Sequence, residues 1–250
     1  MSEQPPDDPY AGITFGVETA RRIIELSRGL AGHFNGVIHA GPFKGMKFGG
    51  DVADGCLIPK LLGCYERELH LALDDAISRK PDVIVNIGCA EGYYAIGLAR
   101  LLPNAQIYAY DINDRARERC ATAARINDVE ERVIIGNLFS HQDFAAFQGK
   151  RVLVVCDIEG GEYALLDPAL APALNGFDLI VETHPLGQKP TLDFARRFLK
   201  THETQIIQPV PGDPGAHPIL GGLSHTDGLL ALFERLEPTP WVYLRARDQA

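Results

Sequence analysis

The chain has 250 residues, of which 46% are apolar and 23% charged, and its formal net charge is −9. This size and composition fit one large domain with a sizeable core, or such a domain with small additions. Nucleic-acid binding depends on clustered Lys and Arg, and the longest basic runs here are arginine pairs. The composition therefore argues against a nucleic-acid partner.

The cysteines and the first residues bear on the cellular compartment. Five cysteines, at positions 56, 64, 89, 120 and 156, show no CxxC spacing, which disfavours both a disulfide framework and a zinc site. The polar, proline-rich start MSEQPPDDP differs from a signal peptide, and no apolar run approaches the ~20 residues that span a bilayer. We therefore expect a cytoplasmic protein without membrane contact.

The first third of the chain predicts a cap in front of the main domain. Residues 1–12 are expected to form a disordered tail. Amphipathic spacing predicts helices over 16–32 and 64–79, and the alternating, Gly- and Pro-broken residues 36–51 predict a short hairpin or flap. Residues 13–80 would together form this N-terminal helical and hairpin cap.

From residue 81 onward, apolar strand-like runs alternate with helical segments. Continuous apolar strands joined by helices are typical of a parallel sheet covered on both faces. The pattern predicts an α/β fold for residues 81–250: a Rossmann-like, seven-stranded, mostly parallel sheet with helices on both faces and one antiparallel edge strand. The Gly- and Pro-rich residues 209–225 predict a long loop, which is either a lid or plain surface. The strands are expected at 82–87, 106–110, 132–135, 151–156, 178–182, 204–210 and 241–246, and the helices at about 92–102, 114–126, 140–147, 161–174, 190–200 and 226–236.

The stretch VIVNIGCAEGYY ends the first of these strands in a turn of small residues and restarts at once as a helix. Glycine lets ligand atoms approach the backbone, and ligands of doubly wound sheets bind beyond the carboxyl ends of the strands. The turn reads G-C-A-E-G-Y, which lacks the G-x-G-x-x-G spacing of dinucleotide enzymes. S-adenosylmethionine (SAM) carries no phosphate, so a G-x-x-x-G turn suffices. We therefore predict a SAM site, rather than an NAD site, formed by Gly88, Ala90, Glu91 and Gly92.

Polar and apolar residues follow the next two strands in matching positions. Asp111, after the second strand, is expected to accept hydrogen bonds from the ribose hydroxyls, and Ile112 to cover one face of the adenine. Asn137, after the third strand, would bond the adenine edge, with Leu138 on its other face. An Asp in this position is also a common helix N-cap, and Gly-Asn is often only a turn. Their joint placement at successive strand ends favours SAM.

Residues from about 63 to 184 resemble the FkbM-type family of class I SAM-dependent methyltransferases. The stretches that carry the resemblance are LGCYERELH, VIVNIGCAEGYYAIGLA, IYAYDIN, VCDIEGGEYALL and LIVETH. The more family-specific parts are D-x-E-G-x-E at 157–162 and E-T-H at 182–184. The chain departs from the pattern at Asn86, where an acidic residue commonly stands, and at Ala90, which replaces a glycine.

Three residues at neighbouring strand ends are the candidate catalytic group. Asp157 directly follows a buried strand, and Glu182 and His184 end the next one, where alternate side chains share a face. Because adjacent strands lie about 4.8 Å apart, the three side chains are expected to converge. Either they bind Mg²⁺ or Mn²⁺, which would hold a diol and lower its pKa, or His184 or Asp157 is a metal-free general base. The resemblance favours the metal. Glu159 and Glu162 are explained as well by carboxylates in the first turn of a helix as by a role in the site.

These features predict a SAM-dependent methyltransferase whose acceptor is a hydroxyl of a small molecule, with sugars and glycosylated metabolites first. The alternatives are a metal-free methyltransferase for a nitrogen or carboxyl acceptor and a SAM-binding module without catalysis. The resemblance further implies that Glu66 reaches the SAM amino group from the cap, and it suggests a homodimer.

Overall fold

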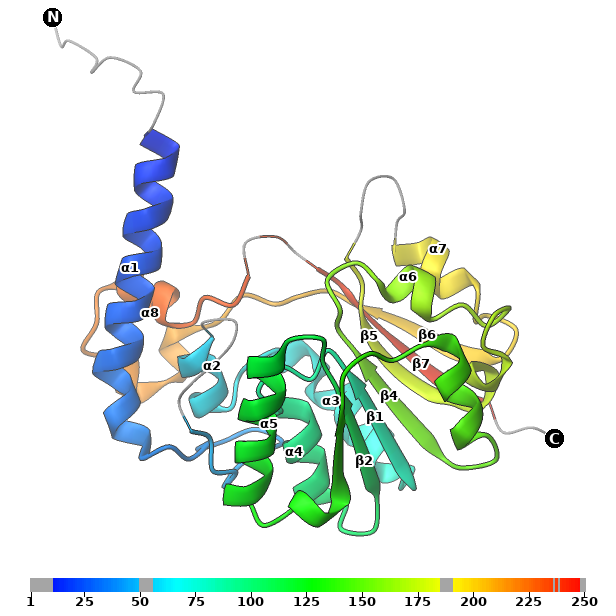
Figure 1. Ribbon diagram of the computed structural model, residues 1–250. Helices are drawn as coiled ribbons and strands as arrows, with labels where there is room; N and C mark the ends of the chain where they lie inside the picture. Colours follow the sequence, from blue (N-terminus) through cyan, green and yellow to red (C-terminus); the bar gives the residue numbers. More distant parts are fainter. Residues whose placement is uncertain (1–10, 50–55, 185–190, 236, 238, 248–250) are drawn as a thin grey trace, which may run out of the picture.

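A seven-stranded sheet forms the centre of the protein (Figure 1). The computed structural model describes residues 11–49, 56–184, 191–235, 237 and 239–247. The strand order is β3-β2-β1-β4-β5-β7-β6; β1 to β5 run parallel, and β7 runs antiparallel to both of its neighbours. The predicted α/β sheet is confirmed, and its antiparallel strand lies between β5 and the edge strand β6. The strands are β1 (Val83–Ile87), β2 (Gln106–Tyr110), β3 (Val133–Gly136), β4 (Val152–Cys156), β5 (Asp178–Glu182), β6 (His202–Ile207) and β7 (Trp241–Ala246).

Helices cover both faces of the sheet, because the central strands are apolar on both sides. In β1, Ile84 belongs to the core on one face, whereas Val83 and Val85 belong to the core on the other. The first core is completed by α3 (His70–Ser78), α4 (Tyr93–Leu101) and α5 (Asp114–Ile126), and the second by η4 (His141–Phe147), α6 (Glu162–Leu165), η5 (Pro172–Gly176) and α7 (Thr191–Arg196).

Several predicted helices are shorter than expected. The helix predicted over 161–174 is divided into α6 and η5, because Pro168 and Pro172 interrupt the backbone hydrogen bonds. The helix predicted over 64–79 begins at His70, after η2 (Arg67–Leu69), because Glu66 adopts a left-handed conformation with φ +46°.

Four further predicted elements differ in their bounds or extent. The helix predicted over 226–236 is α8 (His225–Ala231), and the one over 190–200 ends as α7 at Arg196. The strand predicted over 204–210 begins two residues earlier, as β6. The hairpin predicted over 36–51 is reduced, within the described residues, to a single bridge between Val37 and Lys47.

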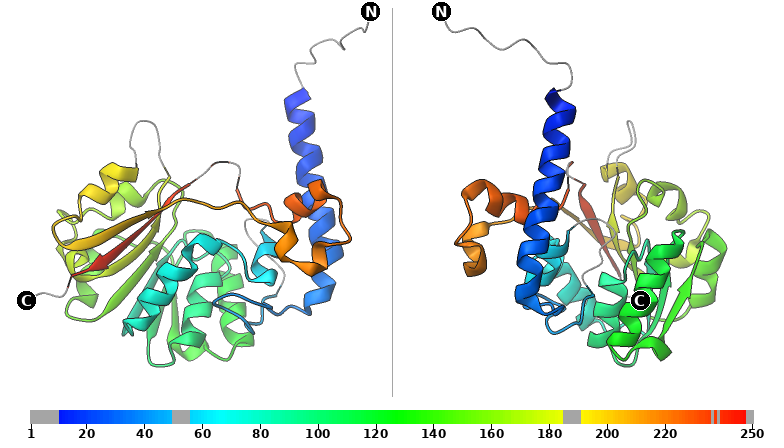
Figure 2. Two further views of the ribbon diagram at one scale, coloured as in Figure 1. Left: turned by 180° about the vertical axis from the view of Figure 1, so that it is seen from behind. Right: turned by 60° about the vertical axis from the view of Figure 1, so that its left-hand side comes forward.

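A cap is built from both ends of the chain (Figures 1 and 2). The long helix α1 (Ala11–Ala31) projects beyond the sheet, and α8 lies beside it, with α2 (Leu57–Leu62) between α1 and the sheet. The Arg22 guanidinium donates two hydrogen bonds of 2.8 Å to Asp227 and so ties α1 to α8. The predicted loop 209–225 forms η6 (Pro214–Ala216) and η7 (Pro218–Leu220) on the way to α8.

The domain division at residue 81 stays a prediction. The cap is not built from residues 13–80 alone, since α8 from the C-terminal part of the chain also belongs to it. The predicted tail lies outside the described residues up to position 10, and positions 11 and 12 begin α1. No helix in the described ranges is both long and apolar enough to cross a membrane.

Candidate active site

The turn between β1 and α4 has a backbone that only small residues adopt easily. Gly88, Ala90 and Gly92 have φ angles of +78°, +46° and +93°. A Cβ on Gly88 would lie 1.6 Å from the carbonyl oxygen of Asp157, so only glycine fits there. Gly88 therefore allows the turn to pack directly against Asp157, the residue that follows β4.

Asp111 holds this turn against the end of β2. Its Oδ2 accepts a hydrogen bond from the amide of Ala90 (2.9 Å), and its Oδ1 accepts one from the amide of Asn113 (2.8 Å). The carbonyl of Tyr110 accepts hydrogen bonds from the amides of Gly88 (2.8 Å) and Cys89. A partly exposed carboxylate thus lies beside the turn, where the sequence predicted a partner for the ribose hydroxyls.

The residues predicted to contact adenine lie at the ends of β2 and β3. Ile112 and Leu138 are 75% and 73% exposed, so both apolar side chains are accessible at these strand ends. Asn137 is exposed as well, and its Oδ1 accepts a hydrogen bond from Arg117 (3.3 Å). These positions suit a flat, partly apolar ligand, and the adenine contacts stay predictions.

Glu91 differs from the other residues of the turn. It is 3% exposed, and its carboxylate forms an ion pair of 2.5 Å with Lys60, which is also buried. The Lys60 ammonium lies 4.6 Å from the centre of the Tyr65 ring. The carboxylate of Glu91 thus faces the interior, so its backbone, rather than its side chain, is available to a ligand over the turn.

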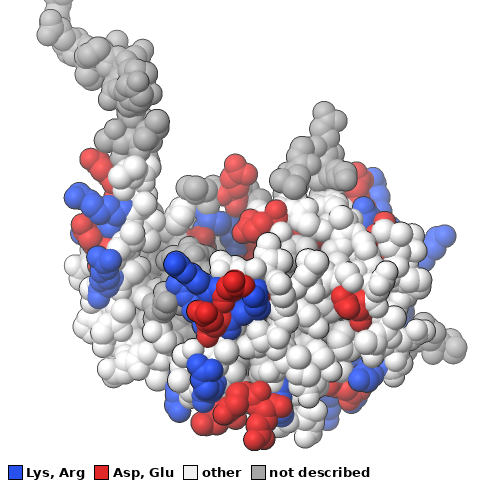
Figure 3. Space-filling model, viewed as in Figure 1, with Lys and Arg blue, Asp and Glu red and all other residues white. Residues whose placement is uncertain are grey.

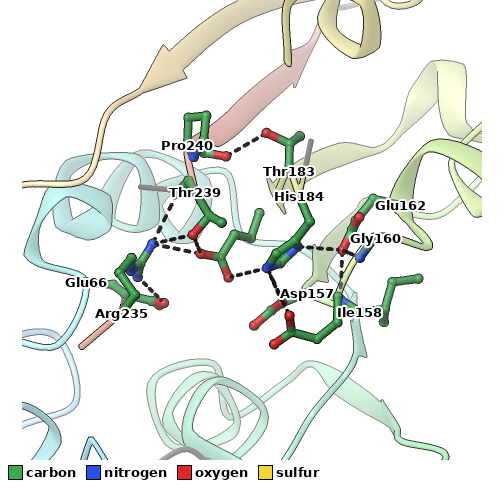
Figure 4. A network of polar contacts seen from close by, with 12 residues as sticks. Glu66, Asp157, Ile158, Gly160, Glu162, Thr183, His184, Arg235, Thr239 and Pro240 are labelled. Atoms are coloured by element: carbon green, nitrogen blue, oxygen red, sulfur yellow. Dashed lines mark hydrogen bonds and ion pairs between the residues drawn. The ribbon is translucent and has the colours of Figure 1, made fainter. Parts of the chain in front are cut away.

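The structure brings Asp157, Glu182 and His184 together, as the strand-end argument predicts. Figure 4 shows Asp157 and His184 beside each other in this cluster. One ligand atom of each lies within 4.8 Å of the others. The Nε2 atom of His184 is 3.9 Å from Asp157 and 3.8 Å from Glu182. The exposed carboxylate of Glu159 approaches the same nitrogen to 3.4 Å.

The carboxylates of the cluster carry more negative charge than the single imidazole of His184 could neutralise. Burial and the charge of Glu182 raise the pKa of Asp157 well above its ordinary value. The Oδ1 atom of Asp157 is buried and has no hydrogen-bond partner in the described part of the chain. Carboxylates in this situation share a proton or bind a cation. Two carboxylates and one imidazole also fit the ligand preferences of Mg²⁺ and Mn²⁺, so the residues fit a divalent metal.

Glu162 sets the orientation of His184. Its carboxylate is completely buried, and its Oε1 accepts hydrogen bonds from the amides of Ile158 (3.0 Å) and Gly160 (3.1 Å) and contacts His184 Nδ1 at 3.0 Å. Burial alone would raise the pKa of Glu162, but these hydrogen bonds lower it overall. An ionised Glu162 only accepts, so Nδ1 of a neutral His184 carries the proton and the lone pair of Nε2 faces the cluster.

The same contacts act on the pKa of His184. Burial would lower this pKa, but the hydrogen bond to Glu162 and the charges of Glu182, Glu162 and Glu159 outweigh burial and raise it. His184 therefore holds a proton more readily than a free imidazole. The sequence left Glu162 open between a carboxylate at a helix start and a functional residue; in the structure its carboxylate contacts His184 Nδ1 at 3.0 Å.

Arg235 was missed by sequence reasoning, which placed it inside a predicted helix. Its guanidinium donates to Glu182 Oε1 (2.7 Å) and to Glu66 Oε1 (2.8 Å) (Figure 4). The hydroxyl of Thr239 also donates to Glu182 Oε1. One oxygen of Glu182 is thereby held from the cap side, and Oε2 is the oxygen that lies toward His184.

Glu66 lies on the other side of the Arg235 guanidinium. It is 2% exposed and also accepts a hydrogen bond from the Tyr94 hydroxyl. Burial and the charge of Glu182 raise the pKa of Glu66 to about 8, although Arg235 opposes this rise. A left-handed, buried carboxylate is strained and costly, which is typical of functional positions. Its contact with the SAM amino group stays a prediction.

The strand order, the antiparallel β7 and the glycine turn after β1 define a Rossmann-like α/β fold with one antiparallel strand. No protein-family model matches the chain, so membership of the FkbM type stays a prediction. A stretch of 60 residues, 24% of the chain, is 37% identical to the release factor glutamine methyltransferase of Flavobacterium psychrophilum, and the match spans only about a fifth (21%) of that protein.

Solved structures of similar arrangement include two O-methyltransferases. TomG from Streptomyces achromogenes, in complex with SAM, aligns with a TM-score of 0.49 and 18% identity over 75% of this chain and 82% of TomG. An O-methyltransferase from Bacillus cereus, in complex with SAH, aligns with a TM-score of 0.47 and 14% identity over 92% of this chain and 91% of that one.

Proposed function

We propose that the protein is a SAM-dependent methyltransferase that methylates a hydroxyl group of a small molecule. One observation carries the proposal: the glycine turn that suits SAM touches the chain leaving β4, which bears Asp157 of the acidic cluster. A methyl donor over the turn and an acceptor at the cluster would be neighbours at one edge of the sheet. Such proximity of two bound reactants is the main requirement of a group transfer.

The proposed reaction needs an acceptor for one proton. SAM supplies an electrophilic methyl group; its C–S bond breaks as a C–O bond forms, and S-adenosylhomocysteine (SAH) leaves. Where no metal occupies the cluster, the proton of the acceptor hydroxyl passes to Nε2 of His184 or to the carboxylate of Asp157. Glu162 prepares the first route by holding the proton of His184 on Nδ1.

A divalent metal fits the same residues. Asp157, Oε2 of Glu182 and Nε2 of His184 would hold Mg²⁺ or Mn²⁺, which lowers the pKa of a bound hydroxyl. The buried, unpartnered oxygen of Asp157 supports this assignment. Sugars and glycosylated metabolites are the first acceptor class, because neighbouring hydroxyls chelate such a metal. Figure 3 shows acidic and basic side chains intermingled on one face of the protein, in keeping with a small-molecule acceptor.

Calorimetric titration with SAM, SAH and NAD, with and without Mg²⁺, tests the cofactor. We expect micromolar binding of SAM and SAH and none of NAD. Asp157→Asn should retain SAM affinity while abolishing methyl transfer to a panel of sugar hydroxyls, and a chelator should abolish transfer by the wild type. Failure to bind SAM or SAH would refute the proposal.

Methylation of a nitrogen is the second candidate. The similarity over 60 residues to a release factor glutamine methyltransferase favours it. In that case a chelator would leave transfer intact, and amide or amine acceptors would react where sugars do not.

A further inference from the structure

A cavity lies at the amino ends of β4 and β5, whereas the acidic cluster lies at their carboxyl ends. It has a volume of about 770 Å³ and is lined by the first residues of β4 and β5, by η5 and by the last residue of β7. Ligand pockets typically occupy about 300–1,000 Å³. Val152 lines this cavity, and Asp157 follows the other end of the same strand, so about 16 Å of strand separates the two locations.

Four basic residues from three segments of the chain line this cavity. Arg79 follows α3, Lys150 and Arg151 precede β4, and Arg247 follows β7. Asp178 is the acidic residue of the lining. This concentration of positive charge is unexpected in a chain whose net charge is −9.

Two of the four cations are already paired. Arg79 donates to Asp178 (2.7 Å), whose other oxygen accepts from the amide of Ala246 (2.8 Å). Arg151 forms a two-pronged pair with Asp82 outside the cavity, at 3.1 and 2.6 Å.

The other two cations form no ion pair with a carboxylate in the described ranges. They are Lys150 and Arg247, and both side chains are exposed. The guanidinium of Arg247 donates a hydrogen bond to the backbone carbonyl of Lys200, at 3.5 Å. Both line the cavity. Among the described residues, two basic side chains that line the cavity therefore have no carboxylate partner.

We infer that this cavity is a binding site for a small phosphate-bearing ligand, separate from the proposed SAM site. Arg offers a planar fork and Lys a point charge, the two groups that proteins use for phosphate oxygens. Gly149, before β4, and Gly176, at the end of η5, also line the cavity, and a residue without a Cβ lets a ligand approach the backbone closely. A nucleic-acid strand would need a longer basic surface than these few residues provide.

Titration with pyrophosphate at low ionic strength, with chloride as the control anion, tests the inference. The test variant is Lys150→Gln/Arg247→Gln. The matched control is Arg28→Gln/Lys44→Gln, which removes the same charge from two exposed residues remote from the cavity. We expect the test variant to lose at least about tenfold in pyrophosphate affinity and the control less than about twofold. Ribose 5-phosphate, compared with inorganic phosphate, shows whether a sugar phosphate binds better than free phosphate.

The outcomes are distinct from those of the proposed methyl transfer. Saturating SAH should leave the pyrophosphate affinity unchanged, because the two sites lie at opposite ends of the strands. Equal binding by the wild type and the test variant would overturn the inference, as would absence of binding at millimolar pyrophosphate. Binding of hexaglutamate without binding of pyrophosphate would also overturn it, and would indicate an acidic protein segment instead.

Discussion

Replacing Glu162 with Gln tests whether this residue acts by orienting His184. The side chain keeps its size and one acceptor oxygen, but it loses its charge. Three contacts of 3.0–3.1 Å converge on Oε1. Hydrogen bonds to charged groups are worth about 1 kcal/mol more than neutral ones, which gives about 3 kcal/mol for three. Relief from burying a charge offsets part of this loss, so we expect a net destabilisation of about 1–2 kcal/mol in urea unfolding.

The binding of Mn²⁺ reports on orientation without knowledge of the acceptor. Loss of the partner that fixes a ligating imidazole typically costs 10–100-fold in metal affinity, and we expect about that loss for Glu162→Gln. Glu159→Gln is the matched control, because it removes an equal charge beside the other nitrogen of the same ring, from a side chain that is 85% exposed. It should change Mn²⁺ affinity by less than about threefold. Equal losses of Mn²⁺ affinity in both variants would refute the orientation argument and would indicate that only the net charge around His184 matters.

Three further predictions concern the cofactor turn and the buried cap residue. Asp111→Ala should weaken SAH binding about 10–100-fold by calorimetry, because charge-assisted hydrogen bonds are lost, while Asp114→Ala, at a side chain 84% exposed, should leave it within about twofold. Gly149 has φ +81° and open space around it, so Gly149→Ala should lower the free energy of unfolding in urea by about 1–2 kcal/mol. Gly88→Ala adds a clash with the Asp157 carbonyl and should prevent stable folding. Equal stability of the two variants would contradict the close contact between Gly88 and Asp157. Because the pKa of Glu66 is about 8 when folded and near 4.5 when unfolded, the folded state holds the extra proton between these values; the free energy of unfolding should therefore fall as pH rises from about 4.5 to 8, and an unchanged slope in Glu66→Gln would exclude this residue as a cause.

The sheet and the turn could be predicted from the sequence because their signals are local. Strands buried on both faces appear as continuous apolar runs, and α5 begins where Asn113 caps it through a hydrogen bond to the amide of Arg115. The convergence of Asp157 with Glu182 follows from one further rule, that the carboxyl ends of neighbouring parallel strands share an edge.

The rest of the site depends on contacts between distant segments. Arg235 meets a partner 169 positions away in Glu66 and another 53 positions away in Glu182. No local pattern marks such an arginine, since its place depends on how the cap returns to the sheet. The role of Glu162 was also hidden, because a carboxylate at a helix start is common and the contact with His184 appears only when the strand ends are side by side.

The position of β7 constrains the order in which the protein assembles. β6 joins the sheet through β7, so during synthesis it leaves the ribosome before the strand that attaches it has been made. β5 likewise keeps one edge unpaired until β7 inserts between β5 and β6. Arg235 precedes β7 by a few residues and arrives with it. During synthesis the acidic site can therefore be completed only after β7 has been made, and the nascent chain carries an open sheet edge until then.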